Sequence, residues 1–184
     1  MNTVPRLESK RLILRPFSPE DAGAVQALVD DPDIASTTLH IPHPYTLEMA
    51  QRWIAVNLEK CDRGEISVWG VALKPGRELV GANGLIVHPE GDLGEMGFWV
   101  GKRYWNRGYC TEAAGLVMDY AFSVLRLNKV FAQHFTRNPA SGKVLQKLGM
   151  SHEGRLRQHV RKDDHYEDLE VYGILKREWS RLEA

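Results

Sequence analysis

The segment from Arg103 to Ala113 carries residue types that can bind an anion at the start of a helix. It reads Arg-Tyr-Trp-Asn-Arg-Gly-Tyr-Cys-Thr-Glu-Ala and joins an apolar run at residues 93–100 to a run with helical spacing at residues 111–125. The first turn of a helix has unpaired backbone N–H groups and the positive end of the helix dipole. Gly108 would let the chain turn tightly there. The segment is therefore either an anion-binding loop or an ordinary strand-to-helix connection.

A carboxylate, Glu95, lies in the apolar run directly before this segment. Burying a carboxylate without a partner is costly, so its position needs a physical reason. Alternation along a strand places Glu95 on the same face as Gly97 and Trp99. A carboxylate in such a place can serve as a general base. The alternatives are a structural ion pair and the exposed face of an edge strand.

The anion-binding segment resembles the acyl-CoA pyrophosphate loop of the GNAT superfamily of N-acetyltransferases, and it is closest to the RimJ/RimL-type branch of ribosomal-protein N-terminal acetyltransferases. In the superfamily pattern Gln/Arg-x-x-Gly-x-Gly/Ala, Trp105 stands at the first place, as is usual in this branch, and Cys110 stands at the last. An N-terminal Leu-x-x-x-Arg-Leu-x-Leu-Arg-Pro and a later Asn-x-x-Ser-x-x-x-Leu-x-Lys-Leu-Gly-Met are also similar to family motifs. These motifs occur in the family's order between Leu7 and Tyr172.

The resemblance implies direct transfer of an acetyl group from acetyl-CoA to a primary amine, without an acyl-enzyme. A protein N-terminal α-amino group is one candidate acceptor. The alternatives are a small-molecule or antibiotic amine, another acyl donor such as succinyl-CoA, and a non-catalytic module that binds CoA as a sensor. The glycine spacing of a dinucleotide-binding turn is absent from the segment.

The family's cofactor contacts can be carried over residue by residue. The loop N–H groups would hold the diphosphate, the preceding strand would pair with the pantetheine arm, and an asparagine at the start of a later helix would contact the pantetheine amides. The predicted cofactor-binding residues are Phe98, Trp99, Val100, Trp105, Asn106, Arg107, Gly108, Tyr109, Cys110, Thr111, Asn138 and Ser141.

Two residues are predicted to be catalytic on the same resemblance. Amines are largely protonated at neutral pH, so a base must remove a proton, and Glu95 matches the branch's Glu on the strand before the loop. Many members use a tyrosine to protonate the leaving thiolate, but Leu145 stands at that place. Ser141 is the predicted substitute; the alternative is a first-turn serine that bonds a helix N–H.

The acceptor side is less defined. His40 is a candidate acceptor-binding residue or an exposed loop histidine, and Trp69 is a second candidate whose strand position favours the core. Glu112 is expected to complement the dipole of the central helix. An acyl-cysteine at Cys110 is disfavoured because no histidine is adjacent in sequence. A basic cluster in the C-terminal part is either a solvated face or a steering surface for an acidic acceptor; it comprises Arg155, Arg157, Arg161 and Lys162.

Composition limits the class of protein. The 184 residues contain 24 Lys and Arg against 24 Asp and Glu, which predicts no attraction to nucleic acid or membrane. Cys61 and Cys110 lack metal-binding spacing. With no signal-like N-terminus and no apolar run of about 20 residues, we expect a cytoplasmic protein without a metal, a single GNAT-type domain over residues 1–184, and a monomer or homodimer.

The elements that must position these residues follow from periodicity and caps. They predict an α/β (α+β) fold, with a mixed, mostly antiparallel, twisted sheet and helices on both faces. Expected strands lie at residues 7–17, 65–73, 78–88, 93–100, 129–136, 151–159 and 166–175, with residues 129–136 in a parallel pairing after a crossover. Expected helices lie at residues 19–30, 46–60, 111–125 and 139–148, and residues 34–45 are expected to be irregular.

Overall fold

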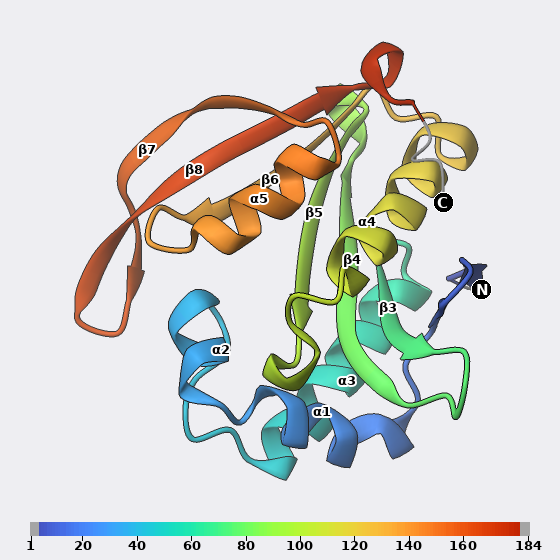
Figure 1. The fold of residues 1–184 in the computed structure, drawn as a ribbon, viewed down its shortest axis with the longest axis vertical. Coiled ribbons are helices and arrows are strands. Elements are labelled where there is room, and N and C mark those ends of the chain that lie inside the picture. Colours follow the sequence, from blue (N-terminus) through green and yellow to red (C-terminus); the bar gives the residue numbers. More distant parts are fainter. Residues whose placement is uncertain (1–3, 181–184) are drawn as a thin grey trace.

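A computed structural model describes residues 4–180, and its centre is one eight-stranded sheet in the order β1-β2-β3-β4-β5-β6-β8-β7 (Figure 1). The strands are β1 (Leu7–Glu8), β2 (Leu12–Arg15), β3 (Ile66–Leu73), β4 (Leu79–His88), β5 (Leu93–Val100), β6 (Lys129–Phe135), β7 (Ser151–Lys162) and β8 (His165–Leu175). The helices are α1 (Ala22–Val29), α2 (Pro32–Thr37), α3 (Leu47–Asp62), α4 (Tyr109–Asp119) and α5 (Pro139–Lys147), and a π-helical turn, η4 (Tyr120–Val124), extends α4.

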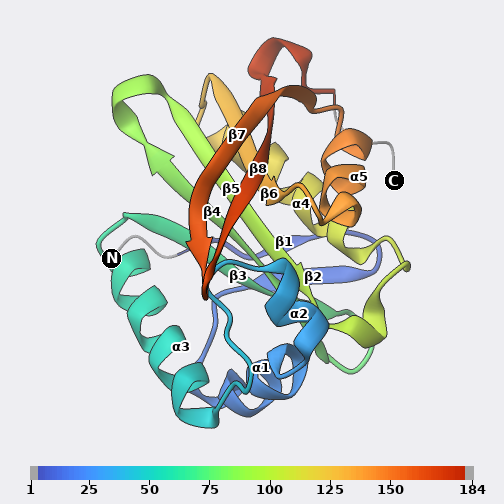
Figure 2. The same ribbon diagram turned by 90° about the vertical axis from the view of Figure 1, so that its left-hand side faces the viewer.

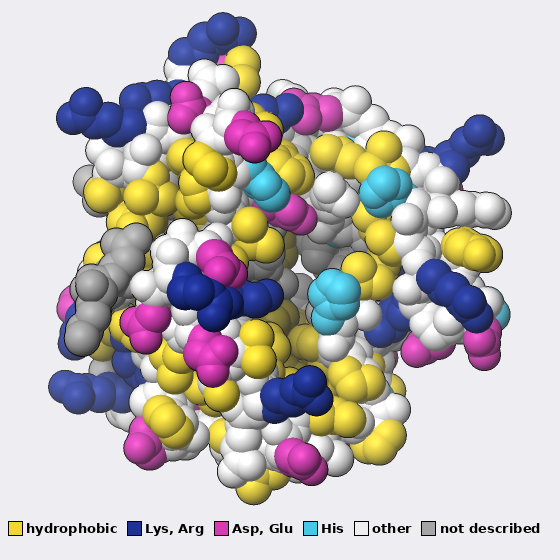
Figure 3. Space-filling view, turned by 180° about the vertical axis from the view of Figure 1, so that it is seen from behind, with side chains coloured by type: hydrophobic (Ala, Val, Ile, Leu, Met, Phe, Trp, Pro, Cys, Tyr) yellow, Lys and Arg dark blue, Asp and Glu magenta, His cyan; other side chains and the backbone are white. Residues whose placement is uncertain are grey.

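The sheet divides at its one parallel pair. All other neighbouring strands are antiparallel, whereas β5 and β6 are parallel and pair only at Leu93–Lys129, Gly94–Val130 and Glu95–Phe131. Beyond that point β5 stays with β4 and β6 stays with β8, so the two halves diverge (Figures 1 and 2). The view from behind shows a hollow near the middle of the surface (Figure 3). The mixed, mostly antiparallel sheet with helices on both faces is as the sequence predicts.

Helices cover both faces of the sheet. Helix α4 packs on β4 and β5 through small buried residues, among them Ala113 and Ala114, which let it approach closely. Helices α1 and α3 pack on the other face, where Trp53 of α3 meets Trp99 of β5 edge to face with ring centroids 6.5 Å apart. Thr46 caps α3, since its hydroxyl accepts from Met49 N at 3.2 Å, and Asn138 caps α5 by accepting from Ser141 N at 3.3 Å. Within residues 4–180, no helix is long and apolar enough to cross a bilayer.

Two expected elements were wrong. Residues 7–17 are two short antiparallel strands, because the chain turns at Ser9, whose N–H donates to the Leu12 carbonyl at 3.0 Å. Part of the segment expected to be irregular is helix α2. It forms because Asp31 caps it by accepting from Asp33 N at 2.8 Å, and Pro32 stands at its first position.

Two apolar residues that continue the helical spacing of their segments are nevertheless exposed. Val124 is 64% exposed because the π-helical turn shifts the periodicity at the end of α4. Met49 is 41% exposed because the buried stripe of α3 runs through Ala50, Ile54 and Cys61 instead.

Close approach of β4 to β5 requires a glycine at position 81. A Cβ on Gly81 would collide with the Trp99 carbonyl oxygen and lie 3.0 Å from Val100 Cα, and neither backbone atom can yield cheaply. We expect Gly81→Ala to lower the free energy of unfolding by about 1–3 kcal/mol. Gly23→Ala in α1, where a Cβ meets nothing within 4 Å, should raise it by up to about 1 kcal/mol. Urea titrations of wild type and the two variants measure these changes. Equal midpoints for Gly81→Ala and Gly23→Ala would contradict the close packing of β4 on β5.

Candidate active site

The segment before α4 presents free backbone donors. Asn106 and Gly108 have positive φ angles, 61° and 77°, and turns of this kind make N–H groups converge into an anion-binding concavity. The first helical bond runs from Glu112 N to the Gly108 carbonyl at 3.0 Å. Within residues 4–180, the N–H groups of residues 106–111 have no protein acceptor. They therefore form an open set of donors at the positive end of the helix dipole.

A set of polar contacts from the β1–β2 turn holds this loop. Arg11 donates to the Arg107 carbonyl at 3.0 Å and to the Glu112 carboxylate at 2.7 Å, and its guanidinium lies 4.8 Å from the centroid of the Tyr109 ring. The Ser9 hydroxyl donates to the other Glu112 oxygen at 2.6 Å. Burial opposes ionisation of Glu112, but the bonds from Ser9 and Arg11 outweigh it and lower the pKa of its carboxyl. Beyond the expected dipole effect, Glu112 thus ties the β1–β2 turn to the loop.

Two of the remaining side chains of the loop, those of Arg103 and Trp105, already have partners within the protein. Arg103 forms an ion pair with Glu78 at 3.0 Å, so its charge is already partnered within the protein. The Trp105 indole donates to the Val100 carbonyl at 2.7 Å and fixes the exit from β5. Arg107 is exposed, with no acidic partner among the described residues.

Glu95 lies at the fork where β5 and β6 part. It belongs to the last pair of the parallel ladder, and its side chain is 38% exposed. Its carboxylate is 3.5 Å from His88 Nε2, and His88 stacks on Phe131 of β6. A Cβ on Gly97 would meet nothing within 4 Å, so space is open beside Glu95. The carboxylate is therefore accessible to a ligand that enters the fork.

The turn from β6 to α5 brings Asn138 and Ser141 together. Asn138 accepts from Ser141 N at 3.3 Å, and its amide donates to the Ser141 hydroxyl oxygen at 2.9 Å and to the Thr37 carbonyl at 3.4 Å. The Ser141 hydroxyl hydrogen has no acceptor among the described residues. Leu145, where the family has a tyrosine, is 1% exposed and packs in the core.

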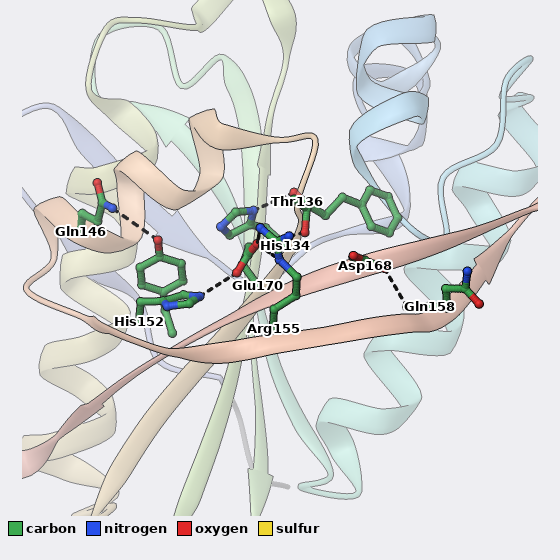
Figure 4. A network of polar contacts seen from close by, with 10 residues as sticks. His134, Thr136, Gln146, His152, Arg155, Gln158, Asp168 and Glu170 are labelled. Atoms are coloured by element: carbon green, nitrogen blue, oxygen red, sulfur yellow. Dashed lines mark hydrogen bonds and ion pairs between the residues drawn. The ribbon is translucent and has the colours of Figure 1, made fainter.

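A polar network that the sequence did not reveal supports this turn (Figure 4). The nearly buried Glu170 carboxylate of β8 accepts from His152 at 2.6 Å, from Arg155 at 2.7 Å and from the Thr136 hydroxyl at 3.1 Å. These bonds, led by His152 and opposed by burial, lower the pKa of Glu170. Next to it lies His134, which is 9% exposed and whose Nε2 atom has no hydrogen-bond partner in the part of the chain that the structure describes. The sequence feature that could have indicated this network is Glu170 itself, a glutamate between apolar residues of a predicted strand.

The predicted acceptor-side residues differ in placement. His40 is exposed, and the carbonyls on either side of it, those of Leu39 and Ile41, accept from Lys162 at 3.5 and 3.3 Å. Trp69 lies in the core, the alternative that its strand position favours. It is fully buried, its indole donates to the Pro5 carbonyl at 2.7 Å, and its ring meets Tyr120 edge to face.

Comparison with known proteins decides the family. A family model described as "Acetyltransferase (GNAT) domain" matches residues 11–151. The chain belongs to the GNAT acetyltransferase family. It is 32% identical over 177 residues to YoaA of Bacillus subtilis, which is named an uncharacterized N-acetyltransferase; the match covers 94% of this chain and 97% of YoaA. The GNAT protein is therefore an N-acetyltransferase by family.

Solved structures share the GNAT fold. A GNAT-family acetyltransferase from Bacillus anthracis aligns with a TM-score of 0.85 at 24% identity, over 95% of this chain and all of that one. RimL, named a ribosomal L7/L12 α-N-protein acetyltransferase and solved with coenzyme A, aligns with a TM-score of 0.84 at 17% identity, over 93% of this chain and 98% of that one. These two likenesses show that the chain has the fold of these proteins.

The lowered pKa of Glu170 predicts a pH dependence of stability. Its stabilising contribution is fully present above the ordinary carboxyl pKa of about 4.3 and is lost as the pH falls through the lowered pKa of the folded state. Glu170→Gln should lower the urea midpoint at neutral pH and flatten its fall in acid. Glu90→Gln, at an exposed turn, is the control. Parallel acid profiles for wild type and Glu170→Gln would show that Glu170 contributes nothing.

Proposed function

We propose that this protein transfers an acetyl group from acetyl-CoA directly to a primary amine, with a protein N-terminal α-amino group as the first candidate acceptor. The observation that carries the proposal is the open set of N–H groups at residues 106–111, beside the fork between β5 and β6. The GNAT membership of the chain and the coenzyme A in the RimL structure support it.

The residues present fit the cosubstrate. The N–H groups of residues 106–111 would hold its diphosphate, and the positive end of α4 favours that charge. The edge of β5 beyond Glu95, including Phe98, Trp99 and Val100, has no strand partner on the β6 side and is available for the pantetheine amides. Asn138 would complete these contacts from the other half of the sheet. The cosubstrate supplies an acetyl group activated as a thioester.

The chain would supply the proton transfers. Glu95, at the fork, takes a proton from the ammonium form of the acceptor, directly or through a water, so that the amine becomes nucleophilic. The His88 Nε2 atom lies 3.5 Å from this carboxylate. The Ser141 hydroxyl, held by Asn138 at 2.9 Å, donates to the departing sulfur.

A covalent route through Cys110 is disfavoured. Burial raises the pKa of the Cys110 thiol to about 12. The thiolate is the nucleophilic form of cysteine, so hardly any would exist at neutral pH. Direct attack of the amine on the thioester is the route the residues support.

Incubation with labelled acetyl-CoA tests the function. The substrates are ribosomal-protein N-terminal peptides, polyamines and aminoglycosides, each with a control whose amine is blocked. We expect label to move to at least one free amine and not to its blocked form. If coenzyme A binds but no amine is labelled, the protein is a sensor rather than an acetyltransferase. A parallel reaction uses labelled succinyl-CoA. Transfer from succinyl-CoA and not from acetyl-CoA would show that the proposed donor is wrong.

Replacing Glu95 tests the base. Glu95→Gln should lower kcat/KM at pH 7 by roughly a hundredfold, within the range for loss of a general base. The deficit should shrink as the pH approaches the amine pKa, about 8 for an α-amino group, because the acceptor then loses its proton unaided. Glu90→Gln, in the turn between β4 and β5, is the matched control. An unchanged rate and pH profile would exclude Glu95 as the base.

A further inference from the structure

Strand β7 bends away from β8 beside the candidate site. The pairing shifts between Leu156–Leu169 and Val160–Glu167, so residues 157–159 stand opposite Asp168 alone. Gln158, at the top of this arch, has a φ of 47°, and its N–H donates to the Asp168 carboxylate at 2.8 Å. Bulges near active sites commonly re-aim side chains. Here the arch borders an open cavity of about 660 Å³, lined by Arg155, Leu156, Arg157, Gln158, His159 and Asp168.

The cavity lining combines basic residues with one carboxylate, that of Asp168, and its Arg157 guanidinium has no ion-pair partner within residues 4–180. Three basic residues of the hairpin are committed: Arg155 to Glu170, Arg161 to Asp164, and Lys162 to backbone carbonyls. Arg157 and His159 are exposed, and neither has an acidic partner within residues 4–180. Of the basic cluster expected from the sequence, Arg157 is thus the member without an internal partner, and it lines the cavity together with His159 and Asp168.

The cavity lies next to the turn that carries Asn138 and Ser141. The backbone N–H of Thr136 donates to the Asp168 carbonyl at 3.0 Å, and the Thr136 hydroxyl donates to Glu170. Figure 4 shows Thr136, Asp168 and Gln158 along one side of the hairpin. Thr136, two residues before Asn138, thus joins the cavity-lining residue Asp168 to the turn that carries Asn138 and Ser141.

We propose that this cavity binds an anionic group, a carboxylate or a phosphate, of the amine acceptor, with Arg157 as its principal contact. This rests on the proposed function, because it assumes that the acceptor is bound for acetyl transfer. A guanidinium forms paired hydrogen bonds with both kinds of anion, and an uncommitted one loses no internal partner when it does so. The acceptor is thus an amine whose anionic group extends toward the β7 arch.

Kinetics with matched peptides test the subsite. Three short peptides share a free N-terminal serine and differ at the following positions, which carry carboxylates, their neutral amides, or phosphoserine. Wild type should show a lower KM for an anionic peptide than for the neutral one. Arg157→Ala should raise KM for the preferred anionic peptide by roughly fivefold to tenfold, with kcat within about twofold, and leave the neutral peptide unaffected.

The control is Arg161→Ala, on the same hairpin but outside the cavity lining and paired with Asp164. It should leave all three KM values unchanged. Which anionic peptide responds to Arg157→Ala identifies carboxylate or phosphate as the natural group. The same KM ratios in wild type and Arg157→Ala would overturn the subsite while leaving acetyl transfer intact.

Direct binding separates this proposal from the proposed function. Calorimetry measures the affinity of each peptide for the full chain in the presence of coenzyme A, without turnover. If wild type labels no amine but binds the anionic peptide through Arg157, the subsite stands and the acetyl-transfer proposal fails. If the anionic and neutral peptides bind equally to wild type and to Arg157→Ala, the cavity is not the subsite.

Discussion

The unsatisfied N–H groups at the start of α4 are the constraint around which this structure is arranged. A helix start leaves donors that need a partner, and here residues 106–111 find none within the described chain. The brace from Arg11 and Ser9 to Glu112 keeps the loop from folding over these donors, since it fixes the Arg107 carbonyl and the first turn of α4 from one side. An anion or solvent must therefore complete the site.

The fork in the sheet gives these donors a neighbouring channel, and contacts between its two halves keep it in shape. Asn138 reaches the Thr37 carbonyl from α5, and Lys162 reaches the carbonyls flanking His40 from the tip of β7. The Glu170 network joins β7, β8 and the Thr136 turn into one support. The half that carries Glu95 and the half that carries Ser141 are thus linked through the loop after α2. This arrangement places Glu95 and Ser141, the proposed base and proton donor, on opposite sides of the fork.

Local sequence patterns predicted most of the helices and strands, but they did not predict contacts between residues far apart in the chain. Caps at Thr46 and Asn138 and the alternation of β3 to β5 depend on neighbouring residues, and these elements form as expected. The fork depends on where a parallel ladder between distant strands ends, which no local pattern encodes. The Arg11–Glu112 contact and the Glu170 network also join residues far apart in the sequence, so no local pattern predicted them. The strand position of Trp69 favoured the core, and its ring is fully buried there. The catalytic roles of Glu95 and Ser141 stay predictions.

The most direct measurement is a crystal structure of the protein with coenzyme A. The account predicts the two phosphates within hydrogen-bond distance of the N–H groups of residues 106–111 and the pantetheine arm along β5 beyond Glu95. A complex with the diphosphate bound elsewhere, or a loop closed so that its own side chains take those N–H groups, would contradict it.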